Sequence, residues 1–264
     1  MSDRSSIPFL PAGAEALVRI DEGVLSGTGT TMSVGAGPWL RDPVVGVCRA
    51  AMGVVLDDVT GYSVALAAPD DRWPVSLGIR LDFHGDPPTA GAPMAAVGEV
   101  VGFDAQGAIS RGEVRAQDGS TVGLITQRSH LRTVAAKPNS PDVAVSHPDP
   151  DLSIRELLRL VDVSAGVVEM RPGTFAANER GDVHGGVQIT GAEFAAMSAL
   201  GASGEYRTTS VDIVYLRPGD ASDTLTFRAE VVHRGRSMAM VRVDMISSDG
   251  KPCSRATLVI QKSV

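Results

Sequence analysis

The sequence predicts an α+β protein that contains two copies of one unit, each a long helix followed by four antiparallel strands that wrap around it. Three observations support this prediction. Each half of the chain contains a mostly apolar run long enough for a buried helix. In each half, turn signals then separate four strand-like segments. The two halves also match one another at a nearly constant offset, as expected for an internal repeat.

The repeat is visible as matched residues. Ser76 in the first half matches Thr208 in the second. Three further matches share almost the same offset: Glu99-Val100-Val101 with Glu230-Val231-Val232, Arg111 with Arg242, and Asp118-Gly119 with Asp249-Gly250. The alternative is chance similarity between β-rich segments that share Asp-Gly turns. An almost constant offset over so many positions favours a repeat.

In the N-terminal half, short apolar runs over residues 15–34 predict one or two strands. Residues 42–67 predict a long, mostly buried helix, whose apolar run is interrupted by Asp57 and Asp58. Four strands are then expected near residues 75–84, 93–103, 108–117 and 121–131.

The C-terminal half repeats this order after a stretch rich in proline, aspartate and serine. Residues 133–151 have the composition of a linker, so we expect residues 1–132 and 152–264 to form two domains. The second unit is predicted to contain a short helix over 153–159, a strand over 161–170, a loop and helix around His184, and strands near 207–216, 223–233, 237–247 and 253–262.

Composition excludes several classes of function. The 264-residue chain has a formal charge of −7 and no basic block, which argues against a nucleic-acid-binding surface. Cys48 and Cys253 lack metal-ligand spacing and predict two free thiols in a reducing compartment. The sequence contains no run of 18 apolar residues and no signal-peptide pattern. We therefore expect a soluble cytoplasmic protein without a metal or a membrane partner.

One stretch carries the candidate chemistry. Residues 178–194 read Asn-Glu-Arg-Gly-Asp-Val-His-Gly-Gly-Val-Gln-Ile-Thr-Gly-Ala-Glu-Phe, and the apolar spacing after the paired glycines indicates that a loop becomes a helix there. The first N–H groups of a helix have no internal partner and lie at the positive end of its dipole. Because glycine lets a ligand approach the backbone, His184-Gly185-Gly186 could hold an oxyanion. A simple tight turn is the alternative interpretation.

The longer pattern Asn-x-x-Gly-x-x-His-Gly-Gly is followed by Glu193 and by a strand ending in Tyr215-Leu216-Arg217-Pro218. Over residues 152–262 this resembles the hotdog-fold acyl-CoA thioesterases of the phenylacetate-pathway (PaaI-like) type. The resemblance implies two hotdog folds in tandem, forming a pseudo-dimer within one chain. It also implies hydrolysis of acyl-CoA or acyl-carrier thioesters, with coenzyme A present as part of the substrate and no separate cofactor.

In the resembling family each site lies between two hotdogs. One hotdog supplies the Asn and the His-Gly-Gly helix start, and the other supplies an acid and a Ser or Thr. Carried over to this chain, the complete site combines Asn178, His184 and Gly185 with Asp58 and Ser76. Asp57 is the alternative acid, because an alignment error of one residue would exchange the two.

The second site would be degenerate. It would combine Glu193 and Thr208 with Arg49-Ala50-Ala51, which occupies the place of His-Gly-Gly and lacks the glycine pair. Each of these side chains also has a purely structural interpretation, as a helix-surface carboxylate or an ordinary strand residue.

The expected roles follow the family. The Gly185 N–H would hold the oxyanion, and Asp58 would activate water or attack the carbonyl directly. Asn178 would orient the water or the carbonyl, Ser76 would position the carboxylate or the water, and His184 would fix the loop. Four residues are candidates to contact the coenzyme: Gly186, Arg217, Arg234 and Arg236.

Two other functions compete with thioester hydrolysis. A hotdog hydratase or dehydratase would carry an Asp-x-Asn-Pro-x-His run, which this sequence lacks. A double hotdog that binds acyl-CoA without catalysis is consistent with the degenerate Arg49-Ala50-Ala51 segment. The sequence leaves open the acyl chain, the choice between coenzyme A and a carrier protein, and whether the pseudo-dimers form a homo-oligomer.

Overall fold

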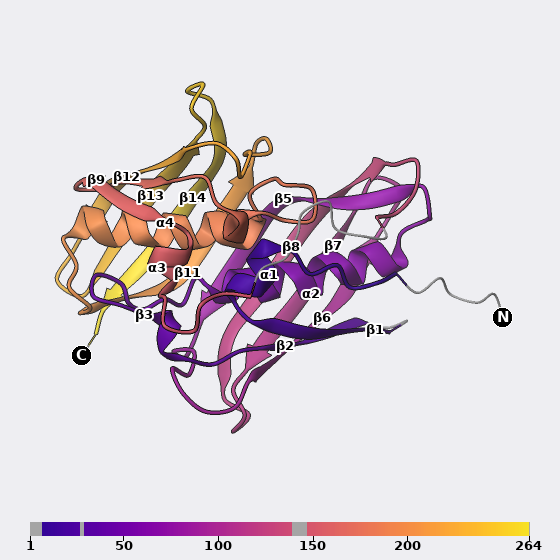
Figure 1. Ribbon diagram of the computed structural model, residues 1–264, viewed down its shortest axis with the longest axis horizontal. Coiled ribbons are helices and arrows are strands. Elements are labelled where there is room, and N and C mark those ends of the chain that lie inside the picture. Colours follow the sequence, from indigo (N-terminus) through magenta and orange to yellow (C-terminus); the bar gives the residue numbers. More distant parts are fainter. Residues whose placement is uncertain (1–6, 27–28, 139–146, 264) are drawn as a thin grey trace.

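The computed structural model describes residues 7–26, 29–138 and 147–263. Its two long helices, α2 (Met52–Ala67) and α4 (Gly185–Leu200), each pack against one half of a single antiparallel sheet. Figure 1 shows the N-terminal half in indigo to magenta beside the C-terminal half in orange to yellow. This is the α+β, tandem hotdog architecture that the sequence predicts.

The remaining elements of the N-terminal half are α1 (Gly13–Leu17), β1 (Ile20–Ser26), β2 (Gly29–Val34), the 3-10 turn η1 (Pro38–Leu40), β3 (Arg41–Asp42), β4 (Gly46–Val47), β5 (Arg72–Phe83), β6 (Met94–Phe103), β7 (Gly107–Arg115) and β8 (Thr121–Thr133). Those of the C-terminal half are α3 (Ile154–Leu157), β9 (Leu160–Ser164), β10 (Val167–Met170), the 3-10 turn η2 (Thr174–Ala176), β11 (Tyr206–Tyr215), β12 (Leu225–Arg234), β13 (Met238–Ile246) and β14 (Pro252–Lys262).

One antiparallel pair of strands joins the two halves. The sheet order is β1-β2-β6-β7-β8-β5 in the first half and β11-β14-β13-β12-β10-β9 in the second, and β5 pairs with β11. In this pair Ile79 lies opposite Ile213, and Leu81 lies opposite Val211. These four side chains are buried, so the junction contributes to the core as well as to the backbone hydrogen bonding.

The structure repeats the matches seen in the sequence. Glu99 lies opposite Arg111 on β6 and β7, and Glu230 lies opposite Arg242 on β12 and β13, and each pair forms an ion pair. Both Asp-Gly turns place their glycine in the left-handed region, with φ of 83° and 81°. The strands that carry Ser76 and Thr208 each have a register irregularity directly after that residue. The two units therefore share local geometry as well as topology.

Helix α2 begins at Met52 rather than near residue 42. The preceding segment forms the short β3–β4 hairpin, because Pro43 lacks a backbone N–H and Gly46 adopts a φ of 78°. The Asp42 carboxylate accepts hydrogen bonds from the N–H groups of Val44 and Val45 and pairs with Arg155 of the other half at 2.6 Å. The predicted helix was thus too long at its N-terminal end.

Two other elements differ from the prediction. Residues 13–17 form helix α1, so strand β1 begins only at Ile20. Residues 160–170 form a hairpin of β9 and β10 instead of one strand, because Gly166 turns the chain with a φ of 75°.

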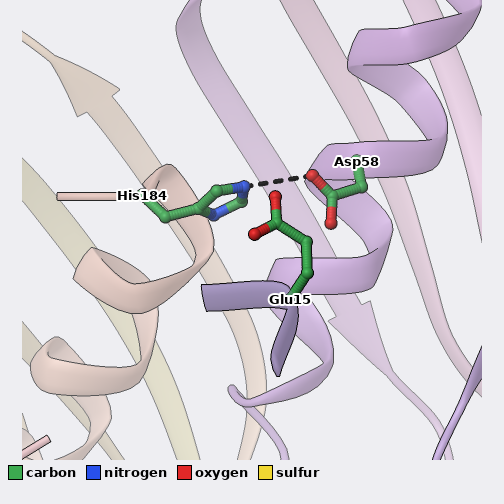
Figure 2. A group of neighbouring side chains, drawn as sticks. All are labelled: Glu15, Asp58 and His184. Atoms are coloured by element: carbon green, nitrogen blue, oxygen red, sulfur yellow. Dashed lines mark hydrogen bonds and ion pairs between the residues drawn. The ribbon is translucent and has the colours of Figure 1, made fainter. Parts of the chain in front are cut away.

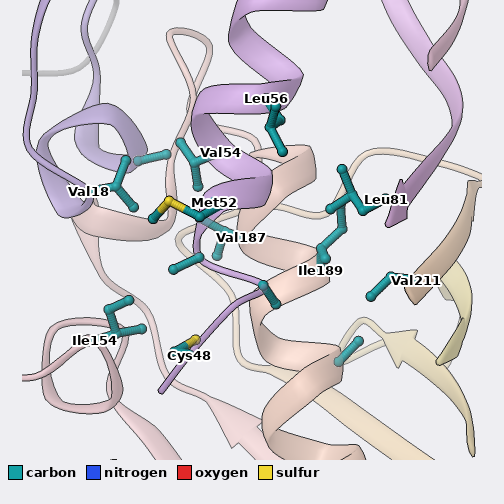
Figure 3. Close-up of a cluster of buried hydrophobic side chains, with 14 of the residues drawn as sticks. Val18, Cys48, Met52, Val54, Leu56, Leu81, Ile154, Val187, Ile189 and Val211 are labelled. Carbon is teal, nitrogen blue, oxygen red and sulfur yellow. The ribbon is translucent and has the colours of Figure 1, made fainter. Parts of the chain in front are cut away.

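The N-terminal ends of α2 and α4 touch. A Cβ atom added to Gly186 would lie 2.3 Å from the Val54 backbone nitrogen, so only glycine permits this approach. Figure 3 shows Met52 of α2 and Ile189 of α4 within the same buried apolar cluster. Because both helices are surrounded by apolar groups, polar residues on them must find partners inside the protein.

The predicted linker does not begin as a free segment. Strand β8 continues to Thr133, and the Lys137 ammonium donates to the Ala65 and Ala68 carbonyls at the C-terminal end of α2. The middle of the predicted linker, residues 139–146, lies outside the described residues. Within the described part of the chain, no helix has the length and apolar character needed to cross a membrane.

Candidate active site

The start of helix α4 is organised by His184 and the loop before it. His184 is the N-cap residue, and its Nδ1 accepts the Gly186 N–H at 3.0 Å. In the loop, Asn178 Oδ1 accepts the backbone N–H groups of Arg180 and Asp182 at 2.9 and 3.1 Å. The hydrogen bonds of Asn178 therefore shape the loop that delivers His184 to its place.

On α2, Asp57 forms a hydrogen-bonded set with two strand residues. Ser76 Oγ donates to Asp57 Oδ1 at 3.1 Å, and Gln127 Nε2 donates to the same oxygen at 2.7 Å. Gln127 Nε2 also lies 2.6 Å from Ser76 Oγ, and its Oε1 accepts from the Thr60 hydroxyl. Both donors engage Oδ1, so the other oxygen of Asp57 is left to face the α4 N-terminus.

The other Asp57 oxygen, Oδ2, accepts no hydrogen bond among the described residues; it lies 3.7 Å from His184 Nδ1 and against Gly185. A Cβ atom added to Gly185 would lie 2.4 Å from Asp57 Oδ2, which is closer than side-chain atoms tolerate. The Gly185 N–H has no hydrogen-bond partner among the described residues, as expected for the first residue of a helix. A carboxylate oxygen of one half and an unpartnered N–H group of the other therefore both lie at Gly185, on the border between the two halves.

The two adjacent aspartates have different partners. Asp58 Oδ1 lies 3.1 Å from His184 Nε2, and it is Asp57 that contacts Ser76. Ser76 was expected beside Asp58, and the structure separates that pair. Asn178, His184, Gly185, Ser76 and both aspartates nevertheless line one cavity.

Gln127 and Glu15 were not among the predicted site residues. Gln127 occupies an inward position on β8, between the buried Ile125 and Ser129. A polar residue at an inward strand position was the signal that could have revealed it. Glu15 lies on the five-residue helix α1, which is too short to give a clear periodicity.

Figure 2 shows Glu15, Asp58 and His184 directed toward one another from α1, α2 and the start of α4. One ligand-type atom from each lies within 4.8 Å of the others, so the group has the composition of a metal site. The Gly186 N–H, however, occupies Nδ1 of His184. We therefore assign the imidazole proton to Nε2, where it donates to Asp58 and leaves no lone pair for a metal.

Burial and neighbouring charges shift the acidity of this group. Burial raises the pKa of Glu15 to about 8, and the negative charge of Asp58 adds to the effect. Burial alone would lower the pKa of His184, but Asp58, Asp57 and Glu15 outweigh it and raise that pKa to about 10. The Gly186 N–H opposes a second proton on the ring, because a protonated Nδ1 cannot accept it.

Asp57 has an intermediate acidity. Burial raises its pKa to about 6, while His184 and the hydrogen bonds from Ser76 and Gln127 act in the opposite direction. A carboxylate with this pKa is mostly ionised at neutral pH and is a stronger base than an exposed aspartate. These are the properties expected of a general base.

The cavity has a volume of about 420 Å³ and takes residues from both halves of the chain. Part of its wall is apolar and comes from Tyr62, Trp73, Leu77, Val183 and Leu216. Three arginines also border it: Arg132, Arg180 and Arg217. The cavity therefore offers an apolar surface, a reactive carboxylate and positive charge within one space.

The predicted coenzyme contacts fall in different places. Arg217 lines the cavity, but Arg234 and Arg236 are not among its lining residues. Arg234 instead donates to the Tyr206 hydroxyl near the other end of β11. Gly186 is packed against the backbone of α2, and its N–H already binds His184. The structure therefore brings only one of these four candidates to the cavity with its side chain free to reach a ligand.

The matching position in the other half is filled. Glu193 is fully buried, and its Oε2 accepts from Cys48 Sγ at 3.1 Å and from the Ala50 N–H at 3.2 Å. The buried Arg49 guanidinium pairs with Asp86 at 2.6 Å and donates to the Thr208 carbonyl at 3.2 Å. A working site here would need the Ala50 N–H to be free for the substrate carbonyl. Instead, this N–H donates to the Glu193 carboxylate.

Strand register also identifies the counterpart of Gln127. Gln127 lies opposite Ile79 on β5, and Leu258 lies opposite Val211 on β11. Val211 is the repeat counterpart of Ile79, because the same offset relates Ser76 to Thr208. The second half thus has a leucine where the first half has the amide that donates to Asp57.

The two cysteines agree with the sequence analysis. Cys48 and Cys253 are both buried free thiols, as predicted.

One known protein family matches the part of the sequence that contains the start of α4. Residues 180–254 match the thioesterase superfamily. The match includes His184, Gly185 and the strands β11 to β13. A search of curated proteins finds no match to this chain.

Solved structures share the fold over almost the whole chain. A protein of unknown function with a hot dog fold from Alicyclobacillus acidocaldarius is 14% identical, with a TM-score of 0.63 over 96% of this chain and 98% of that one. Acyl-CoA thioesterase II TesB2 from Mycobacterium marinum is 12% identical, with a TM-score of 0.58 over 94% and 97%. An acyl-ACP thioesterase from Bacteroides thetaiotaomicron is 13% identical, with a TM-score of 0.58 over 87% and 96%. Identities this low show the fold alone.

Proposed function

We propose that this protein hydrolyses acyl-CoA thioesters in the manner of a PaaI-like thioesterase, with one working site per chain. The observation behind the proposal is that Asp57 Oδ2 lies against Gly185, whose N–H has no hydrogen-bond partner among the described residues, and that both residues line one cavity. Ester and thioester hydrolysis needs a base and an oxyanion donor close to the same carbonyl group. The thioesterase superfamily match over the α4 start adds support.

Asp57 supplies the reactive carboxylate. Its Oδ2 either accepts a proton from the attacking water or attacks the thioester carbonyl itself, and both routes need an ionised oxygen that is free. Ser76 and Gln127 hold Oδ1 and leave Oδ2 directed at Gly185. In the water route, the tetrahedral intermediate then collapses, the carbon–sulfur bond breaks, and the proton passes to the departing thiolate.

Gly185 supplies the oxyanion donor. Its N–H lies at the positive end of the 16-residue helix α4, so the helix dipole adds to the hydrogen bond. Losing one such donor typically lowers kcat by about 100- to 1,000-fold. His184 and Asp58 fix this helix start from the side, through the cap to Gly186 and the 3.1 Å hydrogen bond between them.

The cavity suits a coenzyme A ester. Its apolar wall, including the buried Trp73 and Tyr62, fits an acyl group, while Arg132, Arg180 and Arg217 suit phosphate groups. A carrier-protein thioester presents a single phosphate on a protein surface and would use fewer of these arginines. We therefore place coenzyme A first among the carriers.

The second site is inactive in this proposal. Glu193 already occupies the Ala50 N–H, and the Arg49 side chain fills the space beside Thr208. A carbonyl oxygen would have to displace a buried carboxylate from that N–H before it could bind there.

The test is release of free thiol from short, long and aromatic acyl-CoAs. Wild type should turn over at least one ester, and Asp57→Asn should lower kcat by about 100-fold or more, as expected when a general base is lost. The matched change Glu193→Gln at the filled site should leave kcat within about twofold. Loss of turnover in Glu193→Gln with retention in Asp57→Asn would reverse the assignment.

A further outcome separates catalysis from binding. If no ester is hydrolysed while acyl-CoAs still bind, measured by calorimetry, the protein is a binding module and the hydrolase proposal is wrong.

Asp58→Asn distinguishes the two aspartates. Because Asp58 acts through His184, we expect its loss to have a smaller effect on kcat than the loss of Asp57.

A further inference from the structure

The Tyr215 hydroxyl is a buried polar group that the proposed mechanism leaves unused. Tyr215 is the last residue of β11, and its side chain lines the cavity. Its hydroxyl oxygen is buried without a hydrogen-bond partner among the described residues. A buried hydroxyl without a partner is destabilising, so such a group in a cavity indicates a hydrogen bond that is completed by a ligand.

The Tyr215 hydroxyl lies beside Gly185 and Asp57, the two residues proposed to act on the thioester. The atoms nearest to a Cβ added to Gly185 would come from two side chains, with Asp57 Oδ2 at 2.4 Å and Tyr215 Oη at 2.9 Å. The carboxylate and the hydroxyl therefore both lie against Gly185, whose N–H has no hydrogen-bond partner among the described residues. A carbonyl oxygen bound to that N–H would lie near the Tyr215 hydroxyl.

The other half of the chain provides an internal comparison. Tyr215 lies opposite Ser254 on β14, and Phe83, the last residue of β5, lies opposite Gly123 on β8. Phe83 is the repeat counterpart of Tyr215, because the two are separated by the same offset as Ser76 and Thr208. The first half of the chain therefore has a phenylalanine at the repeat position where the second half has a tyrosine.

We propose that the Tyr215 hydroxyl is a second oxyanion donor, which hydrogen-bonds the thioester carbonyl oxygen beside the Gly185 N–H. This proposal rests on the thioesterase function proposed above and adds a catalytic residue to it. The phenol keeps its proton throughout and transfers none, so the step requires no acid or base beyond Asp57. Burial, followed by the negative charge of Asp57, raises the pKa of Tyr215 well above its usual range and keeps the group a donor.

Tyr215 could instead donate its hydrogen bond to Asp57, and the two roles predict different pH dependences of kcat. A donor to the carbonyl oxygen acts in the transition state, so its loss lowers kcat equally at every pH. A donor to Asp57 would lower the pKa of that carboxylate, so its loss would move the acid limb of the pH–rate profile upward. The two roles therefore separate in one experiment.

The experiment compares wild type, Tyr215→Phe and Tyr206→Phe with one hydrolysed acyl-CoA across pH 5 to 9. Tyr206→Phe is the matched control, because its hydroxyl binds Arg234 at the surface and it lies on the same strand. We expect Tyr215→Phe to lower kcat by about 100-fold, with KM and the acid limb unchanged, and Tyr206→Phe to match wild type. Phenylalanine already holds the matching position at the end of β5, so we expect Tyr215→Phe to fold.

Two results would overturn the proposal without touching the proposed function. One is a wild-type kcat in Tyr215→Phe, and the other is a loss that disappears at high pH because the acid limb has moved. If wild type itself hydrolyses no thioester, the proposed function fails and the role of Tyr215 fails with it.

Discussion

Replacing Gln127 with leucine should make the reactive carboxylate less acidic by a predictable amount. Gln127 Nε2 lies 2.7 Å from Asp57 Oδ1, and a hydrogen bond to an ionised group contributes about 1.5–3 kcal/mol. Because one pKa unit corresponds to about 1.36 kcal/mol, loss of this bond raises the pKa of Asp57 by about 1–2 units. The starting value is about 6. Leucine fits the fold at this register, since Leu258 holds the matching position.

The assay is the pH dependence of kcat/KM for a hydrolysed acyl-CoA. Asp57 must lose its proton to act, so the wild-type rate should rise with pH through about 6. In Gln127→Leu the midpoint should move to about 7–8, and part of the lost rate should return at high pH. Gln106→Leu, in the exposed β6–β7 turn, is the control. An acid limb that stays near 6 in Gln127→Leu would show that the amide does not set the acidity of Asp57.

Three further predictions concern single sites. Gly185→Ala places a Cβ 2.4 Å from Asp57 Oδ2, so thiol release should fall by about 100-fold or more, and a retained rate would contradict the close contact. Glu15 has a pKa of about 8 in the folded protein against 4.5 as a free side chain, so its contribution to stability is lost as pH rises through this window. Between pH 5 and 8 the Tm of Glu15→Gln should therefore fall less than that of wild type. Parallel plots of Tm against pH for the two proteins would show that the pKa of Glu15 is not raised. Gly98→Ala would bring a Cβ to 2.3 Å from the Val59 carbonyl, so urea unfolding should show a loss of about 1–3 kcal/mol, whereas Gly102→Ala on the same strand, with open space around it, should show little change.

The repeat and the turns could be predicted from the sequence because they depend on local patterns. Ion pairs between neighbouring strands and Asp-Gly turns recur with the same spacing in each half, and the structure contains both. The start of α2 could not be predicted in this way. The apolar run continues upstream through the β3–β4 hairpin, so hydrophobicity alone gives no boundary, and Pro43 and Gly46 mark it only in retrospect.

The choice between Asp57 and Asp58 required the packing of the whole protein. Consecutive helix residues point about 100° apart, but α2 is buried on nearly all sides, so no exposed face orients it. Ser76 of β5 hydrogen-bonds Asp57, whereas His184 Nε2 at the α4 start hydrogen-bonds Asp58. Gln127 joins the site from a distant part of the chain through the register of β8. Such long-range pairings leave no local signal in the sequence.

The joining of β5 to β11 has a consequence for how this protein can vary. In a dimer of identical subunits every substitution appears twice, so a change that improves one pocket alters both. Here the carboxylate, with Ser76 and Gln127, belongs to one unit, while the helix start and Tyr215 belong to the other. Each unit is encoded separately and meets different demands. Arg49 and Phe83 can therefore serve the internal structure of the protein while selection refines a single pocket.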